Sequence, residues 1–312
     1  MNTSQKKIYK NGLIVSAHNI NAYLEDAPNI IVKDRHEPIS DNQKMAVGSF
    51  ATDGGNLVIQ DKDYETFIAK EPKAMKYIRP YIGPDEFIKG RKRYCLWLKD
   101  CPPKELLSMP LVEKRVQAVR DFRLRSKKKQ TQARADIPMC FAEDRQPDAN
   151  YILIPRTSSE KRKYLPMGFM PKNVIAGDVI ILPDATLYQF GILMSNVHNA
   201  WMRAVCGRLE LRYRYSNTMV YNTLPFPVPT EKQKESIEKT AQEILDARAA
   251  YSESTMAELY SEKMYLYPEL LKAHRANDKA VMQAYGFWGK LNSESECVAE
   301  LMKMYEQLTK AK

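Results

Sequence analysis

The spacing of apolar residues changes character near residue 229. Before that point, short apolar runs rich in β-branched residues are bounded by Asn, Asp, Pro and Gly, which is typical of strands joined by turns. We expect strands in the following segments: 12–17, 29–33, 56–60, 92–100, 138–143, 150–156, 163–169, 173–183 and 185–193. The first part of the chain is therefore expected to be rich in mixed or antiparallel β-sheet.

Other stretches of the first part have helical spacing instead. Apolar residues recur three and four positions apart in 64–77, 109–136 and 197–208. In 109–136 this spacing fades in the second half, and the basic run there includes Lys127, Lys128 and Lys129. We expect one long helix whose basic end lies along a phosphate backbone, where each neutralised phosphate adds salt-dependent affinity. The alternative is a solvated helix face.

Beyond residue 229 helical spacing continues to the end of the chain. A first helix begins at Thr230, with Gln233 placed to complete a capping box. A second follows Pro268, and a third begins at Ser293 with Glu296 as its capping partner. The apolar stripe of each helix predicts the core of a small helical bundle.

These patterns predict two domains, residues 1–229 and residues 230–312. The expected fold class is α+β: a mixed or antiparallel β-rich domain that carries a long basic helix, followed by an all-α C-terminal helical bundle.

The segment that precedes this boundary places charged residues at every second position. If it is extended, Glu210, Arg212 and Arg214 lie on one face, with tyrosines between them. Such a face suits the major groove of DNA, because Arg donates to guanine O6 and N7 and a carboxylate accepts from cytosine N4. The alternative is a solvated strand whose Glu and Arg pair with one another. Three prolines between Pro225 and Pro229 then end the unit.

The charge of the chain is concentrated in its first part. The net charge is +10, yet residues 229–312 hold 12 Lys and Arg against 14 Asp and Glu. A strongly basic domain beside a nearly neutral one points to a polyanionic partner for the first domain only, with nucleic acid as the first candidate. A further basic cluster supplies predicted phosphate contacts, together with Arg208: Ser158, Ser159, Lys161, Arg162 and Lys163.

No membrane segment or secretory leader is expected, since no apolar run approaches the roughly 20 residues of a span and none follows the charged N-terminus. The 5 cysteines are scattered without a C-x-x-C pair, which fits a reducing cytoplasm.

The sequence offers little for catalysis. No glycine-rich nucleotide loop occurs, and the 4 histidines have no metal-binding spacing. Asp61, Glu71 and Lys73 imitate the D…E-x-K pattern of a Mg²⁺ nuclease, although Pro72 argues against the inner strand that it needs. We expect a binding protein with no catalytic and no metal-ligating residues.

Several ordered motifs resemble one family. They are N-I-N-x-Y-L (19–24), G-S-F-x-x-D-G-G-N-L (48–57), C-L-W-L (95–98), Q-P-D-x-N-Y-I-L-I-P-R-x-S-S-E-x-R (146–162), G-x-L-x-S-x-x-H-x-A-W-M-R-x-V-C-G-R-L (191–209) and Y-R-Y-S-x-x-x-V-Y-N-x-x-P-F-P (213–227). The chain resembles the target-recognition domain and C-terminal helices of MmeI-like single-chain restriction–modification DNA methyltransferases. Neither the glycine-rich S-adenosylmethionine motif nor the N-P-P-Y/F catalytic motif of such enzymes occurs here.

The resemblance implies a module that binds double-stranded DNA beside the N-terminal methyltransferase domain of an adenine-specific parent enzyme. S-adenosylmethionine, with Mg²⁺ as a second candidate, belongs to that parent; this chain alone needs no cofactor and is expected to be inactive. Glu210 and Arg212 are implied to contact a C·G pair, Arg214 a second base and Asp178 a third. The alternatives are a helical protein–protein adaptor or specificity subunit, and a nuclease.

Overall fold

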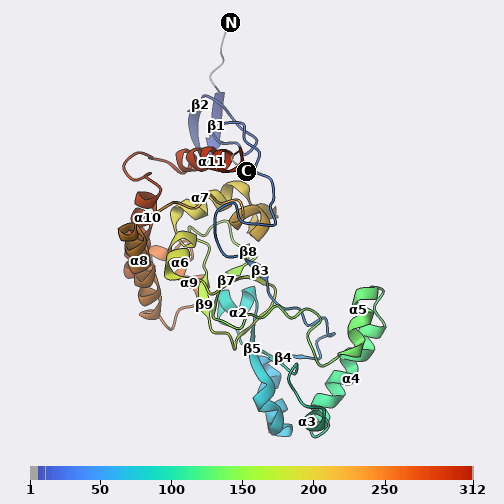
Figure 1. Ribbon diagram of the computed structural model, residues 1–312. Coiled ribbons are helices and arrows are strands. Elements are labelled where there is room, and N and C mark those ends of the chain that lie inside the picture. Colours follow the sequence, from blue (N-terminus) through green and yellow to red (C-terminus); the bar gives the residue numbers. More distant parts are fainter. Residues whose placement is uncertain (1–5, 11, 311–312) are drawn as a thin grey trace. The chain divides into compact units, whose positions relative to one another are not determined.

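The computed structural model describes residues 6–10 and 12–310 (Figure 1). They form two compact units, each of which is described by itself. The helical unit comprises the described residues of Met1–Met45 together with Arg156–Met167 and Ala185–Lys312. The sheet unit comprises Ala46–Pro155 and Gly168–Asp184.

The sheet unit contains two four-stranded sheets. One has the order β10–β5–β6–β4, with β10 parallel to β5 and the other pairs antiparallel; the second, β3–β11–β7–β9, is antiparallel throughout. The strands of the two sheets are β3 (Ala46–Val47), β4 (Val58–Gln60), β5 (Ile78–Ile82), β6 (Arg93–Leu96), β7 (Tyr151–Pro155), β9 (Gly168–Met170), β10 (Ile175–Ala176) and β11 (Val179–Pro183).

Helices and helical turns belong to the same unit. They are α1 (Asp61–Lys70), η1 (Pro72–Tyr77), α2 (Pro84–Lys89), α3 (Pro103–Leu106), α4 (Pro110–Leu124), α5 (Lys129–Ala133) and η2 (Arg134–Asp136). Of these, α1 and α2 pack on strands of the first sheet. The apolar positions of α4, Val112, Val116 and Val119, are buried in a core with Leu96 of β6 and with Leu57, which directly precedes β4. The mixed and antiparallel sheet expected for this part of the chain is therefore confirmed.

The helical unit holds the remaining elements. They are β1 (Lys6–Lys10), β2 (Leu13–Ala17), β8 (Thr157–Ser158), α6 (Leu187–Leu193), α7 (Asn196–Val205), β12 (Gly207–Leu209), β13 (Arg212–Arg214), the π-helical turn η3 (Asn217–Tyr221), α8 (Glu231–Ala249), α9 (Met256–Leu259), η4 (Met264–Leu266), α10 (Pro268–Ala284) and α11 (Glu294–Lys310). No helix in the described ranges is long and apolar enough to cross a membrane.

The three C-terminal helices lie where their caps predict. The Thr230 hydroxyl accepts from the Gln233 amide and so completes the capping box of α8. Helices α8 and α10 pack against each other, α8 also packs on α6, and α11 packs on α7 (Figure 1). The helices are confirmed, and their packing extends beyond the expected bundle to the helices that precede it.

Three predicted strands are wrong, and a fourth, 163–169, is a strand only from Gly168 onward. Segment 185–193 is helix α6, because Thr186 and Gln189 form a capping box that starts a helix. In segment 29–33 the amides of Val32 and Lys33 donate to the hydroxyls of Tyr23 and Tyr305 instead of to a neighbouring strand. Segment 138–143 forms no strand, and only the isolated bridge of Glu143 to Phe50 pairs there.

The prediction of one continuous helix over 109–136 is also wrong. Helix α4 ends at Leu124, and α5 begins only at Lys129 (Figure 1). Between them the Ser126 hydroxyl accepts from the Lys128 amide, a local bond that competes with the helical pattern. The basic run is therefore split between a turn and a short helix.

A buried arginine holds this turn in place. Arg123 is fully buried, and its guanidinium donates to the backbone carbonyls of Ala51, Thr52, Arg134, Ile137 and Cys140. It thus joins the end of α4 to a loop that precedes β4 and to the chain after α5. This role explains why Arg123 faces the core, whereas the lysines that follow it at 127–129 are exposed.

Replacing Arg123 by Met is expected to lower the free energy of unfolding by about 3–5 kcal/mol, because the carbonyls lose their donor in a dry environment. Urea denaturation of the variant measures the change. The exposed Arg125→Met variant is the control and should remain within about 0.5 kcal/mol of the parent sequence. Equal stability of the two variants would contradict the role of Arg123.

Candidate nucleic-acid interface

The charged segment after α7 forms a tight hairpin rather than one extended strand. Strands β12 and β13 pair antiparallel, with Leu209 opposite Arg212, and β8 pairs with β13 to complete a three-stranded sheet. The chain reverses at Glu210 and Leu211, and Glu210 has a φ of 58°. Such a φ is uncommon for a residue other than glycine, and the prediction of continuous alternation is wrong at this turn.

Alternation does hold within and just after β13. Tyr213 and Tyr215 are buried, whereas Arg212 and Arg214 are exposed. The turn brings the Glu210 carboxylate to Arg212, whose Nη2 donates to it at 2.8 Å. The exposed face therefore presents a carboxylate–guanidinium pair, with a second guanidinium two residues further on.

A buried histidine fixes the inner face of this strand. His198 on α7 is fully buried; its Nδ1 donates to the Leu193 carbonyl at 2.7 Å, so its Nε2 accepts from the Tyr215 hydroxyl at 3.0 Å. Burial lowers the pKa of His198 to about 4, against the bond to Leu193, which raises it. The imidazole is therefore neutral at physiological pH and acts as a structural anchor.

Arg208 is exposed but lies on the same face of the hairpin as Tyr213, its cross-strand neighbour. Its guanidinium carbon is 3.9 Å from the centre of the Tyr213 ring, and its Nη1 donates to the Leu211 carbonyl at 3.2 Å. Sequence reasoning missed Tyr213, Tyr215 and His198 as supports of this hairpin. The alternation of Arg and Tyr was the signal that could have identified the tyrosines.

Ser158 and Arg162 support the third strand of the sheet. Ser158 is buried in β8 opposite Tyr213, and its hydroxyl accepts from Arg162 Nη1 at 3.2 Å. Burial lowers the pKa of the Arg162 guanidinium, and its Nε is buried without a hydrogen-bond partner among the described residues. Arg162 therefore keeps a capacity to bind one more acceptor.

The other members of this cluster are closer to solvent. Ser159 accepts from the Lys161 amide, and the exposed Lys161 ammonium lies 3.3 Å from Glu262. Lys163 is exposed, with its ammonium 5.2 Å from the centre of the Tyr164 ring.

One groove of about 940 Å³ in the helical unit connects the predicted phosphate contacts. Its basic lining residues are Lys161, Arg162, Lys163, Arg203 and Arg208. Arg203 is already paired, since its guanidinium makes two bonds of 2.9 and 2.8 Å to Glu294. The groove is also lined by the acidic residues Glu25, Glu160, Asp278 and Glu294, so its charge is mixed, and its exposed cations are Lys161, Lys163 and Arg208.

The other predicted contacts belong to the sheet unit. Asp178 is exposed in the turn between β10 and β11, directly after Gly177. Lys127, Lys128 and Lys129 are exposed where α4 gives way to α5. The structure thus brings the hairpin and the 158–163 cluster together within one unit, while these four residues form part of the other.

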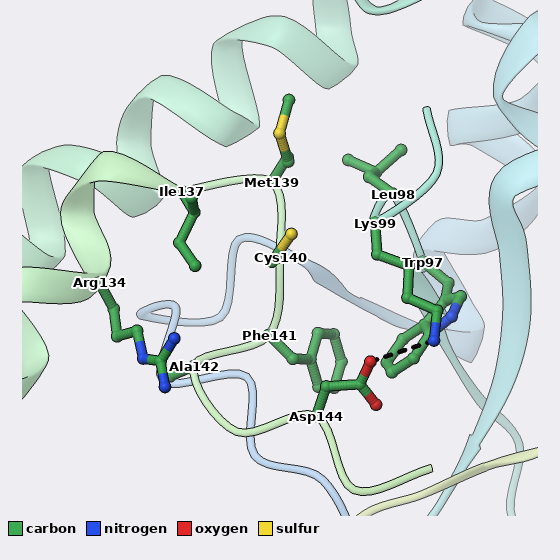
Figure 2. A pocket seen from close by; sticks show the side chains of 10 residues that line it. All are labelled: Trp97, Leu98, Lys99, Arg134, Ile137, Met139, Cys140, Phe141, Ala142 and Asp144. Carbon is green, nitrogen blue, oxygen red and sulfur yellow. Dashed lines mark hydrogen bonds and ion pairs between the residues drawn. The ribbon is translucent and has the colours of Figure 1, made fainter. Parts of the chain in front are cut away.

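A pocket of about 250 Å³ in the sheet unit has an aromatic lining. Figure 2 shows the ion pair of Lys99 and Asp144, 3.1 Å apart, beside the rings of Trp97 and Phe141. Burial raises the pKa of the Cys140 thiol that lines the same pocket. A raised pKa lowers the fraction of the nucleophilic thiolate.

The nuclease-like residues are arranged for structure. Glu71 is buried, and its carboxylate accepts from the Leu111 amide at 3.0 Å, which satisfies a free donor at the start of α4. Asp61 begins α1, and Lys73 is exposed in η1. Within the part of the chain that the structure describes, no three His, Cys, Asp or Glu side chains gather as a metal ion would require.

Comparison with known proteins gives consistent matches over the chain. The model of the MmeI target recognition domain matches residues 26–229, and that of the MmeI C-terminal domain matches residues 228–311. DNA methyltransferase A of Bacillus subtilis (strain 168) is 38% identical over 292 residues, which are 93% of this chain and 33% of the relative.

A solved structure of the Type IIL restriction-modification enzyme MmeI in complex with DNA is 43% identical, with a TM-score of 0.92. The match covers 99% of this chain and 42% of that one. The chain thus spans well under half the length of each of these two relatives.

The buried His198 predicts a pH dependence of stability. The unfolded chain takes up a proton near the ordinary pKa of 6.5, whereas the folded state does so only near about 4. The contribution of His198 to the free energy of unfolding should therefore fall by roughly 3 kcal/mol as the pH drops from 6.5 to 4, and this contribution should change no further below that range.

Urea denaturation at a series of pH values tests this expectation. His198→Gln should be less stable at pH 7 and should show a shallower loss on acidification than the parent sequence. His36→Gln, at an exposed position, serves as the control and should follow the parent curve. Parallel curves for parent and His198→Gln would contradict the assignment.

Proposed function

The chain belongs to the MmeI target recognition domain family, and from that premise we propose that it is the double-stranded DNA recognition module of an adenine-specific DNA methyltransferase of the restriction–modification type. The observation that carries the proposal is the exposed Glu210–Arg212 pair on a hairpin whose inner face is anchored by buried tyrosines. The positive charge of the first 228 residues supports a polyanionic partner.

The Glu210–Arg212 pair fits a C·G base pair in the major groove. Arg212 would donate to guanine O6 and N7, and the Glu210 carboxylate would accept from cytosine N4, each contact contributing about 1–3 kcal/mol of discrimination. The 2.8 Å bond between the two side chains holds them next to each other before DNA arrives. Arg214 would contact a second base and Asp178 a third.

Phosphate contacts would position the module without specifying sequence. We assign them to Lys161, Arg162 and Lys163 in the groove of the helical unit. Ser159 lies in the same cluster, while the buried Ser158 acts by holding Arg162. Lys127, Lys128 and Lys129 would add contacts from the sheet unit.

Methyl transfer and its cofactors belong, in this proposal, to the methyltransferase domain of a longer protein. The residues present fit neither S-adenosylmethionine nor Mg²⁺, because the sequence has no glycine-rich loop and the described side chains form no metal-binding cluster. The chain by itself is proposed to bind DNA without methylating it, and the methyltransferase domain is its partner.

Exchanging the two charges tests the base assignment. Glu210→Lys combined with Arg212→Asp should move the preference at one position of the site to the reversed pair, because donor and acceptor change places. Selection from a duplex library with randomised central positions, followed by sequencing of the bound fraction, gives the preference. An unchanged bound sequence would show that this pair does not contact bases; loss of all preference without a new one would also count against it.

Neutralising Lys127, Lys128 and Lys129 to Gln tests the phosphate contacts of the sheet unit. The slope of log affinity against log salt concentration should become shallower by about 0.9 for each lysine that contacts a phosphate, with sequence preference retained. Fluorescence anisotropy with a labelled duplex at several salt concentrations measures the slope.

The matched control neutralises three exposed lysines of α8 and α10, Lys232, Lys239 and Lys272. Since these helices carry none of the proposed contacts, the control should retain the slope of the parent sequence. Equal effects of the two triple variants would assign the salt dependence to overall charge. A parent sequence whose binding does not depend on salt would favour the protein–protein adaptor over DNA recognition.

A further inference from the structure

We infer that Arg208 is a positioning residue that holds the turn of the base-contacting hairpin, rather than a contact to the DNA backbone. The inference rests on the proposed function. It adds that the discrimination between base pairs by Glu210 and Arg212 depends on the Arg208 guanidinium. It assigns to Arg208 a role different from the phosphate contact that its charge suggests.

The first support is the place of Arg208 in the hairpin register. Arg208 on β12 lies opposite Tyr213 on β13, and its guanidinium packs 3.9 Å from the centre of the Tyr213 ring. Tyr213 is 7% exposed, so its ring provides a fixed surface against which the planar guanidinium stacks. The side chain is thereby directed along the hairpin towards the turn.

The second support is the contact with the turn itself. Arg208 Nη1 donates to the carbonyl of Leu211 at 3.2 Å, and Leu211 forms the two-residue turn with Glu210. Glu210 has a φ of 58°, a conformation that a residue with a side chain keeps only when its surroundings hold it there. The Leu211 carbonyl belongs to the peptide group between Leu211 and Arg212, so one bond constrains the backbone between both base-contacting side chains.

The third support is the precision that base contacts require. Side chains that make bidentate contacts must be held within about 0.5 Å of the productive geometry by their surroundings. A turn with one unfavourable φ and exposed residues at both central positions has few other supports. Arg208 supports the turn in two ways: its planar guanidinium stacks on the Tyr213 ring, and its Nη1 donates to the Leu211 carbonyl. A lysine side chain has no planar group that could stack and donate in this way.

The decisive variant is therefore Arg208→Lys, which keeps the positive charge but loses the planar fork. We expect the ratio of affinities for C·G over G·C at the position contacted by Glu210 and Arg212 to fall about ten-fold, which corresponds to about 1.4 kcal/mol. The salt slope should stay unchanged. If Arg208 contacts a phosphate instead, Arg208→Lys should retain the discrimination, and this result would overturn the inference.

Arg208→Gln gives a second, independent comparison. The positioning role predicts the same loss of discrimination, with a change in salt slope smaller than the roughly 0.9 expected for a lost phosphate contact. A slope shallower by about 0.9 with full discrimination retained would establish a backbone contact and refute the positioning role.

A double-mutant cycle with Tyr213→Leu separates positioning from a general loss of stability. Leucine keeps the buried position apolar but removes the ring, so Tyr213→Leu should lose the same discrimination as Arg208→Lys. The double variant should then lose no more than either single one, whereas additive losses would overturn the coupling. Thermal unfolding of each variant, expected to remain cooperative, accompanies the binding measurements.

The outcomes distinguish this inference from the function on which it rests. A parent sequence without any sequence preference overturns the proposed function and the inference with it. A parent sequence that discriminates, beside an Arg208→Lys variant that discriminates equally, overturns the inference alone.

Discussion

The inward burial of Tyr213 and Tyr215 is the constraint on which the charged face depends. Because side chains alternate along a strand, two buried tyrosines oblige Arg212 and Arg214 to face outward. The Tyr215 hydroxyl is held by His198, and burial keeps that imidazole neutral. The direction of the exposed charged face, to which we assign the base contacts, is therefore set by the core of the helical unit, and the bond between Arg212 and Glu210 then holds the two side chains together on that face.

Arginine serves two opposite purposes in this protein. Arg123 and Arg248 are buried and donate to backbone carbonyls; Arg248 bonds the Met167 carbonyl and the Tyr260 hydroxyl. Arg212 and Arg214 are exposed on the surface, where Arg212 pairs with Glu210. A net charge of +10 thus overstates the charge that a polyanion would meet, since part of it organises loops inside the protein.

Two of the sequence patterns serve structural support. In G-S-F-x-x-D-G-G-N-L, the Asp53 carboxylate accepts from the amides of Gly55 and Val58, and a side chain at Gly54 would lie 2.8 Å from the ring of Phe122. This motif builds a tight loop against α4. Glu71, one of the two acidic residues of the nuclease-like pattern, likewise caps that helix, so both patterns maintain the sheet unit.

The sequence by itself determined the features that rest on neighbouring residues: most of the strands, the capped C-terminal helices, and the outward arginines of β13. The sequence also contained the capping box of α6, formed by Thr186 and Gln189, but the apolar residues that follow led to the prediction of a strand. Only the tertiary structure decided the reversal at Glu210, because neither Gly nor Asn marks a turn there and the positive φ is maintained by contacts across the hairpin. The same holds for Arg123, since the carbonyls that draw it inward come from residues as far away as Ala51 and Cys140.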